Sequence, residues 1–137
     1  MEYIYSKINP DQLLHIINRK EDIVEKRNDL IPPDNYLQLS TFKLNNGKTF
    51  KAHKHIVQEN NFNSRIPQES WTCLQGSFKA ILYDFDDTII AERILNSGDT
   101  SITLCGGHNY QCLEDNTIIL EHKTGPYEGI EKDKEFI

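Results

Sequence analysis

From residue 36 onward, short segments of alternating apolar and polar residues are separated by turn signals, and few folds accommodate this pattern. The segment YLQLSTFKL (36–44) has the period of two of a β-strand, and NNGK (45–48) is a hairpin turn signal. The same pattern predicts further strands within residues 49–57, 70–84 with a break at Gly76, 89–95, 100–105, 110–113 and 116–123. Short strands at this spacing predict an all-β sandwich or barrel. A small barrel can hold one ligand or metal ion in its mouth.

The two ends of the chain depart from this pattern. Asn9 and Pro10 suit the cap and the first position of a helix, and an apolar stripe follows them, so we predict a short N-terminal α-helix over residues 9–26. The segment IPPDN (31–35) ends any helix and opens an extended stretch. The tail from residue 124 to 137 predicts a solvated loop.

The length and charge of the chain limit its class. Its 137 residues fit one domain, which we divide into an N-terminal helix and extended segment (1–35) and a barrel with a C-terminal tail (36–137). The net charge of −6 argues against nonspecific binding to nucleic acid, which needs clustered lysine and arginine. The sequence has no apolar run near the roughly 20 residues that cross a bilayer, no signal-peptide pattern at its start and no CxxC pair. We therefore expect a cytoplasmic protein without a nucleic-acid or membrane partner.

Two histidines lie two positions apart in FKAHKHIVQ (50–58), at His53 and His55. Residues i and i+2 of a strand point to the same face, so these imidazoles either converge on a ligand or lie exposed together on an edge strand. Glu69, and His108 after a glycine-rich turn, can complete a set of imidazoles and one carboxylate on neighbouring strands. Such a set suits a divalent ion, and the remaining coordination positions would take water or substrate.

The spacing of these residues resembles the motifs of the cupin superfamily. A glycine, five residues, His53, one residue and His55, followed by Glu69, six residues and a glycine, resemble the first cupin motif, and GDTSITLCGGH (98–108) resembles the second. The family has three or four residues between the second histidine and the glutamate, and here 13 separate them. Glu59 stands at the short spacing, but only Glu69 stands six residues before a glycine and opens a predicted strand. We therefore assign Glu69 as the carboxylate ligand.

The C-terminal residues carry a more specific resemblance. EHKTGPYEGIEKDKEFI (121–137) is similar to the end of the WbuC-type cupin metalloproteins, where a Glu-x-Lys-x-Gly-Pro-Tyr segment precedes Asp-Lys-Glu-Phe. The genes of that family tend to lie among genes for bacterial surface polysaccharide, such as O-antigen. The resemblance implies a small cupin barrel, a double-stranded β-helix or jelly roll, with one divalent metal ion (Zn, Fe, Mn or Ni). It implies no particular reaction.

Two side chains are candidates for a proton-transferring base beside the metal. Tyr110 lies two residues from His108, and Glu121 alternates with His122 on a predicted strand. We favour the arrangement in which Glu121 and Lys123 face inward. Tyr110 could place its hydroxyl in the pocket.

Four further side chains are candidates for contacts with a substrate. Lys51 shares the face of the histidines, and Arg65 lies in the long loop 56–68, which could close as a lid, so both could meet a phosphate. Trp71 could stack on a sugar ring, although core packing is the commoner role of a tryptophan. Lys123 would line the mouth if it faces inward. For Lys51 and Arg65 the plainer interpretation is a solvated charge.

These residues suggest functions of different classes. We expect first an enzyme that isomerises or epimerises an activated sugar, a small-molecule substrate such as a nucleotide sugar, in surface-polysaccharide synthesis, with the metal polarising a substrate oxygen. The alternatives are Fe(II)-dependent oxygenation and a non-catalytic module that binds a sugar or a metal. Because cupins often pair, we also expect a homodimer.

Overall fold

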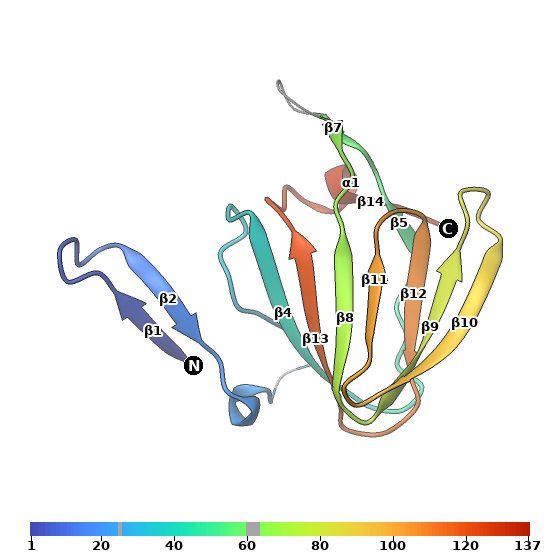
Figure 1. Ribbon diagram of the computed structural model, residues 1–137, viewed down its shortest axis with the longest axis horizontal. Helices are drawn as coiled ribbons and strands as arrows, with labels where there is room; N and C mark the ends of the chain where they lie inside the picture. The colour runs from blue at the N-terminus through green and yellow to red at the C-terminus, as the bar shows by residue number, and fades with distance from the viewer. Residues whose placement is uncertain (25, 60–63) are drawn as a thin grey trace.

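Two antiparallel sheets of five strands form the body of the protein and face each other (Figure 1). The structure is a computed structural model that describes residues 1–24, 26–59 and 64–137. One sheet has the order β10 (Ile89–Asn96), β9 (Ser77–Tyr83), β12 (Gly107–Cys112), β5 (His53–His55) and β14 (Lys134–Phe136). The other has the order β11 (Thr100–Thr103), β8 (Glu69–Gln75), β13 (Thr117–Thr124), β4 (Leu37–Leu44) and β3 (Asn28–Asp29). The predicted all-β architecture is confirmed.

Smaller elements flank the two sheets. β1 (Glu2–Tyr5) and β2 (Leu13–Ile17) form a hairpin that stands apart from the sheets in Figure 1, and the 3₁₀ helix η1 (Lys20–Asp22) follows it. β6 (Gln58–Glu59) pairs with β7 (Ser64–Arg65) in a short ribbon, and α1 (Ile130–Asp133) leads directly into β14.

Aromatic side chains fill the core between the sheets. Trp71 stacks on Tyr110 with ring centroids 4.2 Å apart, and the ring of Phe42 lies 5.1 Å from that of Trp71. All three side chains are buried, and such aromatics supply much of the apolar area that a small core buries. Trp71 and Tyr110 lie two residues beyond Glu69 and His108 on the same faces of β8 and β12. The aromatic core therefore forms a floor beneath these two polar residues.

The turn at Gly76 separates β8 from β9, where the sequence predicts a break. Gly76 has a φ of +75°, and a Cβ atom on it would lie 2.6 Å from Oγ1 of Thr117. Only glycine fits this combination of backbone conformation and close approach. The turn thus fixes the end of the strand that begins at Glu69.

The predicted helix over residues 9–26 is wrong, and a hairpin takes its place. Leu13–Ile17 is a strand that pairs antiparallel with Glu2–Tyr5. In the turn between them, Ser6 Oγ accepts hydrogen bonds from two backbone N–H groups. An apolar run as short as LLHII suits a strand as well as a helix. LLHII forms a strand because it pairs with EYIY (residues 2–5), which is rich in residues that favour strands.

The prediction of a C-terminal loop is also wrong, although much of this segment is exposed as expected. After α1, the chain returns to the first sheet as β14, whose residues Lys134 and Phe136 lie opposite His55 and His53 of β5. Asp133 is only 1% exposed. The Asp-Lys-Glu-Phe run near the end of the chain therefore lies against the histidine strand.

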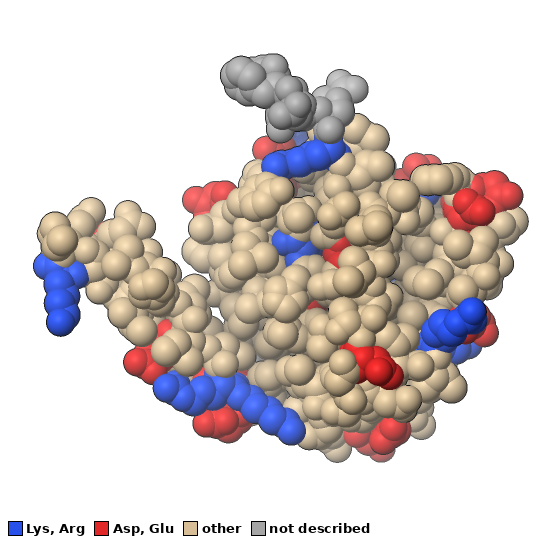
Figure 2. Space-filling model, viewed as in Figure 1, with Lys and Arg blue, Asp and Glu red and all other residues tan. Residues whose placement is uncertain are grey.

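The predicted division of the domain at residue 35 stays a prediction, and β3 pairs with β4 across it. No helix among the described residues is long and apolar enough to cross a membrane. On the face shown in Figure 2, the described lysines and arginines form no broad patch, and several of them lie next to acidic side chains. The expectation that the chain has no nucleic-acid partner also stays a prediction.

Candidate metal centre

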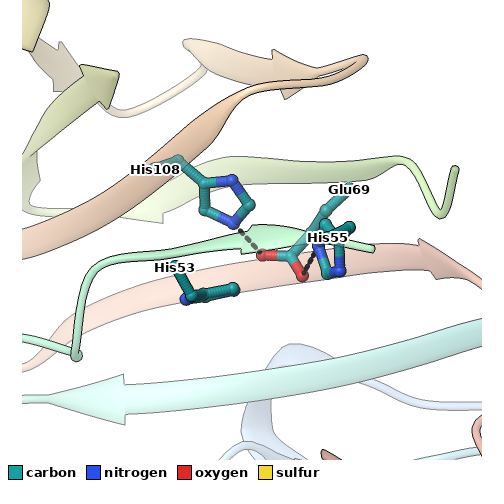
Figure 3. Close-up of side chains that lie close together, drawn as sticks. All are labelled: His53, His55, Glu69 and His108. Atoms are coloured by element: carbon teal, nitrogen blue, oxygen red, sulfur yellow. Dashed lines mark hydrogen bonds and ion pairs between the residues drawn. The ribbon is translucent and has the colours of Figure 1, made fainter. Parts of the chain in front are cut away.

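Imidazoles from one sheet and a carboxylate from the other converge between the sheets (Figure 3). His53 and His55 come from β5, His108 from β12 and Glu69 from β8. One nitrogen or oxygen atom of each lies within 4.8 Å of the others, and all four side chains are buried. His108 lies directly opposite His53 in the pairing of β12 with β5, so it belongs to a strand. The four residues grouped by sequence spacing are thus brought together and could hold one metal ion.

Both oxygens of the Glu69 carboxylate face nitrogen atoms. Oε1 accepts a hydrogen bond from Trp71 Nε1 at 2.6 Å and lies 3.2 Å from His108 Nε2, while Oε2 lies 3.3 Å from His55 Nε2. Burial would raise the pKa of Glu69, but the adjacent imidazoles of His108 and His55 outweigh burial and hold the pKa well below its usual value. Glu69 is therefore an anion at neutral pH, as a metal ligand must be.

The backbone orients the ring of His53. Its Nδ1 atom lies 3.0 Å from the carbonyl oxygen of Lys51, and an N–H donated there leaves the lone pair on Nε2. Burial, followed by the nearby His108 and Lys134, lowers the pKa of His53 to about 4. His53 is therefore neutral at pH 7 with a nitrogen lone pair available, and such outer contacts are typical of metal-binding histidines.

Asp133 in the C-terminal tail orients the ring of His55. Its Nδ1 atom lies 3.3 Å from the carbonyl oxygen and 3.5 Å from the carboxylate of Asp133. Burial would lower the pKa of His55, but Asp133 and Glu69 outweigh burial and raise it to about 9. Because a metal binds neutral imidazole, metal uptake at pH 7 would release a proton from His55.

A buried nitrogen in this group supports a cation at its centre. His55 Nε2 faces Glu69 without the alignment of a hydrogen bond and has no other partner among the described residues. A buried polar atom without a partner costs free energy, and coordination of a cation would supply one. Imidazoles with one carboxylate are ligands that Zn, Fe and Ni accept. The residues present therefore fit a divalent metal ion.

Charged groups from the tail and from β13 surround the centre. Lys134 Nζ lies 3.2 Å from His53 Nε2 and 3.8 Å from Asp133 Oδ2, and Lys123 Nζ donates to that same oxygen at 2.6 Å. Burial lowers the pKa of Lys134. The sequence analysis missed Asp133 and Lys134 as residues of the site. Both residues belong to the Asp-Lys-Glu-Phe run, which was interpreted from sequence only as a family resemblance.

The two candidate bases differ in their surroundings. Glu121 is buried, and Arg27, which the sequence analysis missed, places Nη2 3.3 Å from Glu121 Oε1. Burial and then the charge of Glu69 raise the pKa of Glu121 to about 7. Tyr110 lies in the aromatic core, where burial raises the pKa of its hydroxyl. Only Glu121, of these two, has a pKa near neutrality.

The predicted substrate contacts occupy different places. Lys51 Nζ lies over the ring of Phe136, 4.1 Å from its centroid. Arg65 donates to the carbonyl oxygen of Gly125 at 3.0 Å and lines a cleft of about 690 Å³. Trp71 belongs to the core floor, and Lys123 faces inward to Asp133.

The substrate roles of Lys51, Arg65, Trp71 and Lys123 stay predictions. Residues 60–63 of the predicted lid and the side chain of Glu59 lie outside the described residues.

No protein-family model and no curated protein matches the sequence, but solved structures share its fold. KdgF from Halomonas sp. has a TM-score of 0.56 at 19% identity, over 74% of this chain and 80% of KdgF. The capsular polysaccharide assembling protein CapF from Staphylococcus aureus has a TM-score of 0.65 at 16% identity, over 81% of this chain and 31% of CapF. Oxalate decarboxylase from B. subtilis has a TM-score of 0.60 at 17% identity, over 84% of this chain and 29% of that enzyme. At these identities the likeness concerns the fold alone.

Proposed function

We propose, from the premise that this chain has the cupin fold of those structures, that it binds one divalent metal ion through His53, His55, Glu69 and His108. The observation that carries the proposal is the convergence of these four buried side chains from both sheets. The ion would be Zn, Fe, Mn or Ni. When bound, it would supply a Lewis acid for a substrate oxygen.

The substrate that we propose is a sugar linked to a phosphate or a nucleotide, handled in the cytoplasm during bacterial surface-polysaccharide synthesis. One support is the fold shared with CapF, which is described as a capsular polysaccharide assembling protein. The other is the similarity of residues 121–137 to the WbuC-type ending. The reaction would be an isomerisation or an epimerisation.

In this proposal Glu121 moves the proton. A general base works best when its pKa lies near the working pH, and burial brings the pKa of Glu121 to about 7. Arg27, at 3.3 Å, would hold the carboxylate in place and stabilise its charged form. Trp71 and Tyr110 would form the apolar floor that excludes water, with Tyr110 as the second candidate base. Lys51, Arg65 and Lys123 would contact the anionic part of the substrate.

Nucleotide sugars should bind the metal-loaded protein, and Lys51→Ala and Arg65→Ala should each weaken that binding. A charge-assisted contact to phosphate contributes about 1.5 to 3 kcal/mol, which is roughly tenfold or more in affinity. Calorimetry against a panel of nucleotide sugars measures the effect. Lys79→Ala is a suitable control, because Lys79 pairs with Glu92 on the outer surface.

If no member of the panel binds, or if both variants bind as the wild type does, the assigned phosphate contacts are wrong. Conversion of a bound sugar identifies an enzyme, whereas a ligand recovered unchanged identifies a binding module. Activity that needs iron and dioxygen would identify the oxygenase alternative.

We also propose that the protein is a homodimer joined through its N-terminal hairpin. A hairpin of two strands is marginally stable by itself, yet β1 and β2 stand apart from the sheets with Tyr5 and Leu14 about half exposed. A cleft of about 1390 Å³ separates β2 from the outer face of β4 and β13, where Leu39 and Leu120 line it. Both walls of this cleft are largely apolar. The hairpin of a second copy therefore fits it, in the reciprocal way that a two-fold interface requires.

The double variant Tyr5→Ser/Leu14→Ser should convert this dimer into a monomer. It removes apolar groups that the second copy would cover and leaves the sheets untouched. Light scattering coupled to size-exclusion chromatography measures the mass. Ile94→Ser is the control, because Ile94 is 62% exposed on β10, away from the cleft. A wild-type protein that runs as a monomer at all concentrations tested would show that the hairpin has another role.

A further inference from the structure

The C-terminal strand brings an ammonium group to the nitrogen of His53 that faces the metal centre. Lys134 Nζ lies 3.2 Å from His53 Nε2, while Nδ1 of the same ring is engaged by the Lys51 carbonyl oxygen. Because β14 pairs with β5, Lys134 projects on the same face as the histidines. In the chain without metal, Lys134 thus occupies the lone pair that a metal ion would take.

Once His53 binds a metal, Lys134 has no strong partner among its described neighbours. The Asp133 oxygen that lies 3.8 Å from Lys134 lies 2.6 Å from Lys123, so Lys123 holds it more closely. Glu69 already faces Trp71, His55 and His108. The ammonium group would then stand beside a divalent cation in a partly buried place, where repulsion between like charges is strong.

The carboxylates around the centre are already matched by cations before a metal binds. The protonated His55 and the buried or half-buried cations Arg27, Lys123 and Lys134 stand against the carboxylates Glu69, Asp133 and Glu121, with Asp29 beside Arg27. A divalent ion would therefore leave an excess of positive charge. An anionic ligand removes that excess, whereas a neutral ligand does not.

We propose that Lys134 and the metal ion together bind an oxyanion of the ligand, either a carboxylate or a phosphate. An oxyanion between them offsets the repulsion and accepts a charge-assisted hydrogen bond from the ammonium group. The Lys134 side chain is 20% exposed, so a ligand can reach it from solvent. This inference rests on the proposed metal centre. Lys134 thus becomes a third proposed contact for the anion, beside Lys51 and Arg65, and it lies against the metal ligand His53.

The test measures metal affinity with and without an oxyanion, using Co²⁺ and calorimetry on the metal-stripped full chain. Glucuronate supplies a carboxylate, glucose 1-phosphate supplies a phosphate, and glucose is the neutral reference. Binding of two ligands is reciprocal, so an oxyanion held by Lys134 and the metal must tighten Co²⁺ binding, by at least about fivefold. The probe that produces the larger effect identifies the class of oxyanion.

Lys134→Met should bind Co²⁺ more tightly than the wild type when no oxyanion is present, because the competing ammonium group is gone. The same variant should lose the response to the oxyanion. Lys134→Arg keeps the charge and should keep the response. Lys132→Met is the matched control on the same segment, because Lys132 is exposed and pairs only with Glu128 among its described neighbours.

The inference is overturned if neither oxyanion tightens Co²⁺ binding to the wild type, if glucose acts as strongly as glucuronate, or if Lys134→Met keeps the full response. In each of these cases Co²⁺ binding itself leaves the metal centre in place. A wild-type chain that takes up no Co²⁺ contradicts the proposed function as well. The two failures are therefore distinguishable.

Discussion

Replacing both His53 and His55 with alanine should abolish tight metal binding and leave the sheets folded. The wild type should hold one ion per chain, because four side chains converge on a single centre. Loss of an outer contact to a metal ligand already weakens binding by roughly 10- to 100-fold, so loss of two ligands should exceed that range. The fold should persist because the aromatic core around Trp71 lies beneath the site. Elemental analysis after dialysis gives the stoichiometry, and circular dichroism reports the fold.

The double variant His15→Ala/His122→Ala removes the same number of imidazoles from outside the centre, and it should retain the ion. Glu69→Gln keeps the shape of the side chain and removes its charge, so it should also weaken binding. Glu59→Gln should do little if Glu69 is the ligand. A wild-type chain that holds almost no metal after loading with Zn, Fe, Mn and Ni would contradict the assignment, and reversed effects of the two glutamate variants would contradict its register.

The strands that carry the site were predictable because their patterns are local. Alternation with a period of two identifies β4, the segment around His53 and His55 predicts β5, and the glycine at position 76 marks the turn after β8, which carries Glu69. The spacing of His53, His55 and Glu69 then places these side chains on inward faces, since every second residue of a strand shares a face. The spacing also resembles the cupin motifs, and the barrel that this resemblance implies brings the side chains together.

The hairpin and the tail were not predictable from local pattern. An apolar run such as LLHII is compatible with two kinds of secondary structure, and its partner strand decides between them. The three residues of β14 are too few to show a period, and they pair with β5 from the other half of the chain. Lys134 and Asp133 read as solvated charges in sequence because only this distant pairing buries them. The residues around the metal ligands were missed for the same reason.

Replacing Asp133 with asparagine should destabilise the metal-free protein by about 3 kcal/mol, the low end of the cost of breaking a buried ion pair. Asp133 is 1% exposed, and its carboxylate receives Lys123 at 2.6 Å and lies 3.5 Å from His55. The variant leaves the buried ammonium group of Lys123 without an anion in contact. Urea denaturation gives the free energy of unfolding, and the melting temperature should fall by roughly 10 °C.

Glu131→Gln tests whether this loss is specific, because Glu131 is exposed on the same short helix and should change stability by less than about 0.5 kcal/mol. Asp133→Asn should also weaken metal binding by roughly 10- to 100-fold, since it removes the carboxylate beside His55 Nδ1. Loss of stability with unchanged metal affinity would show that Asp133 stabilises the C-terminal tail and does not orient a metal ligand. Loss of both would show that the tail, through Asp133, holds the histidine strand in the orientation that the metal centre needs.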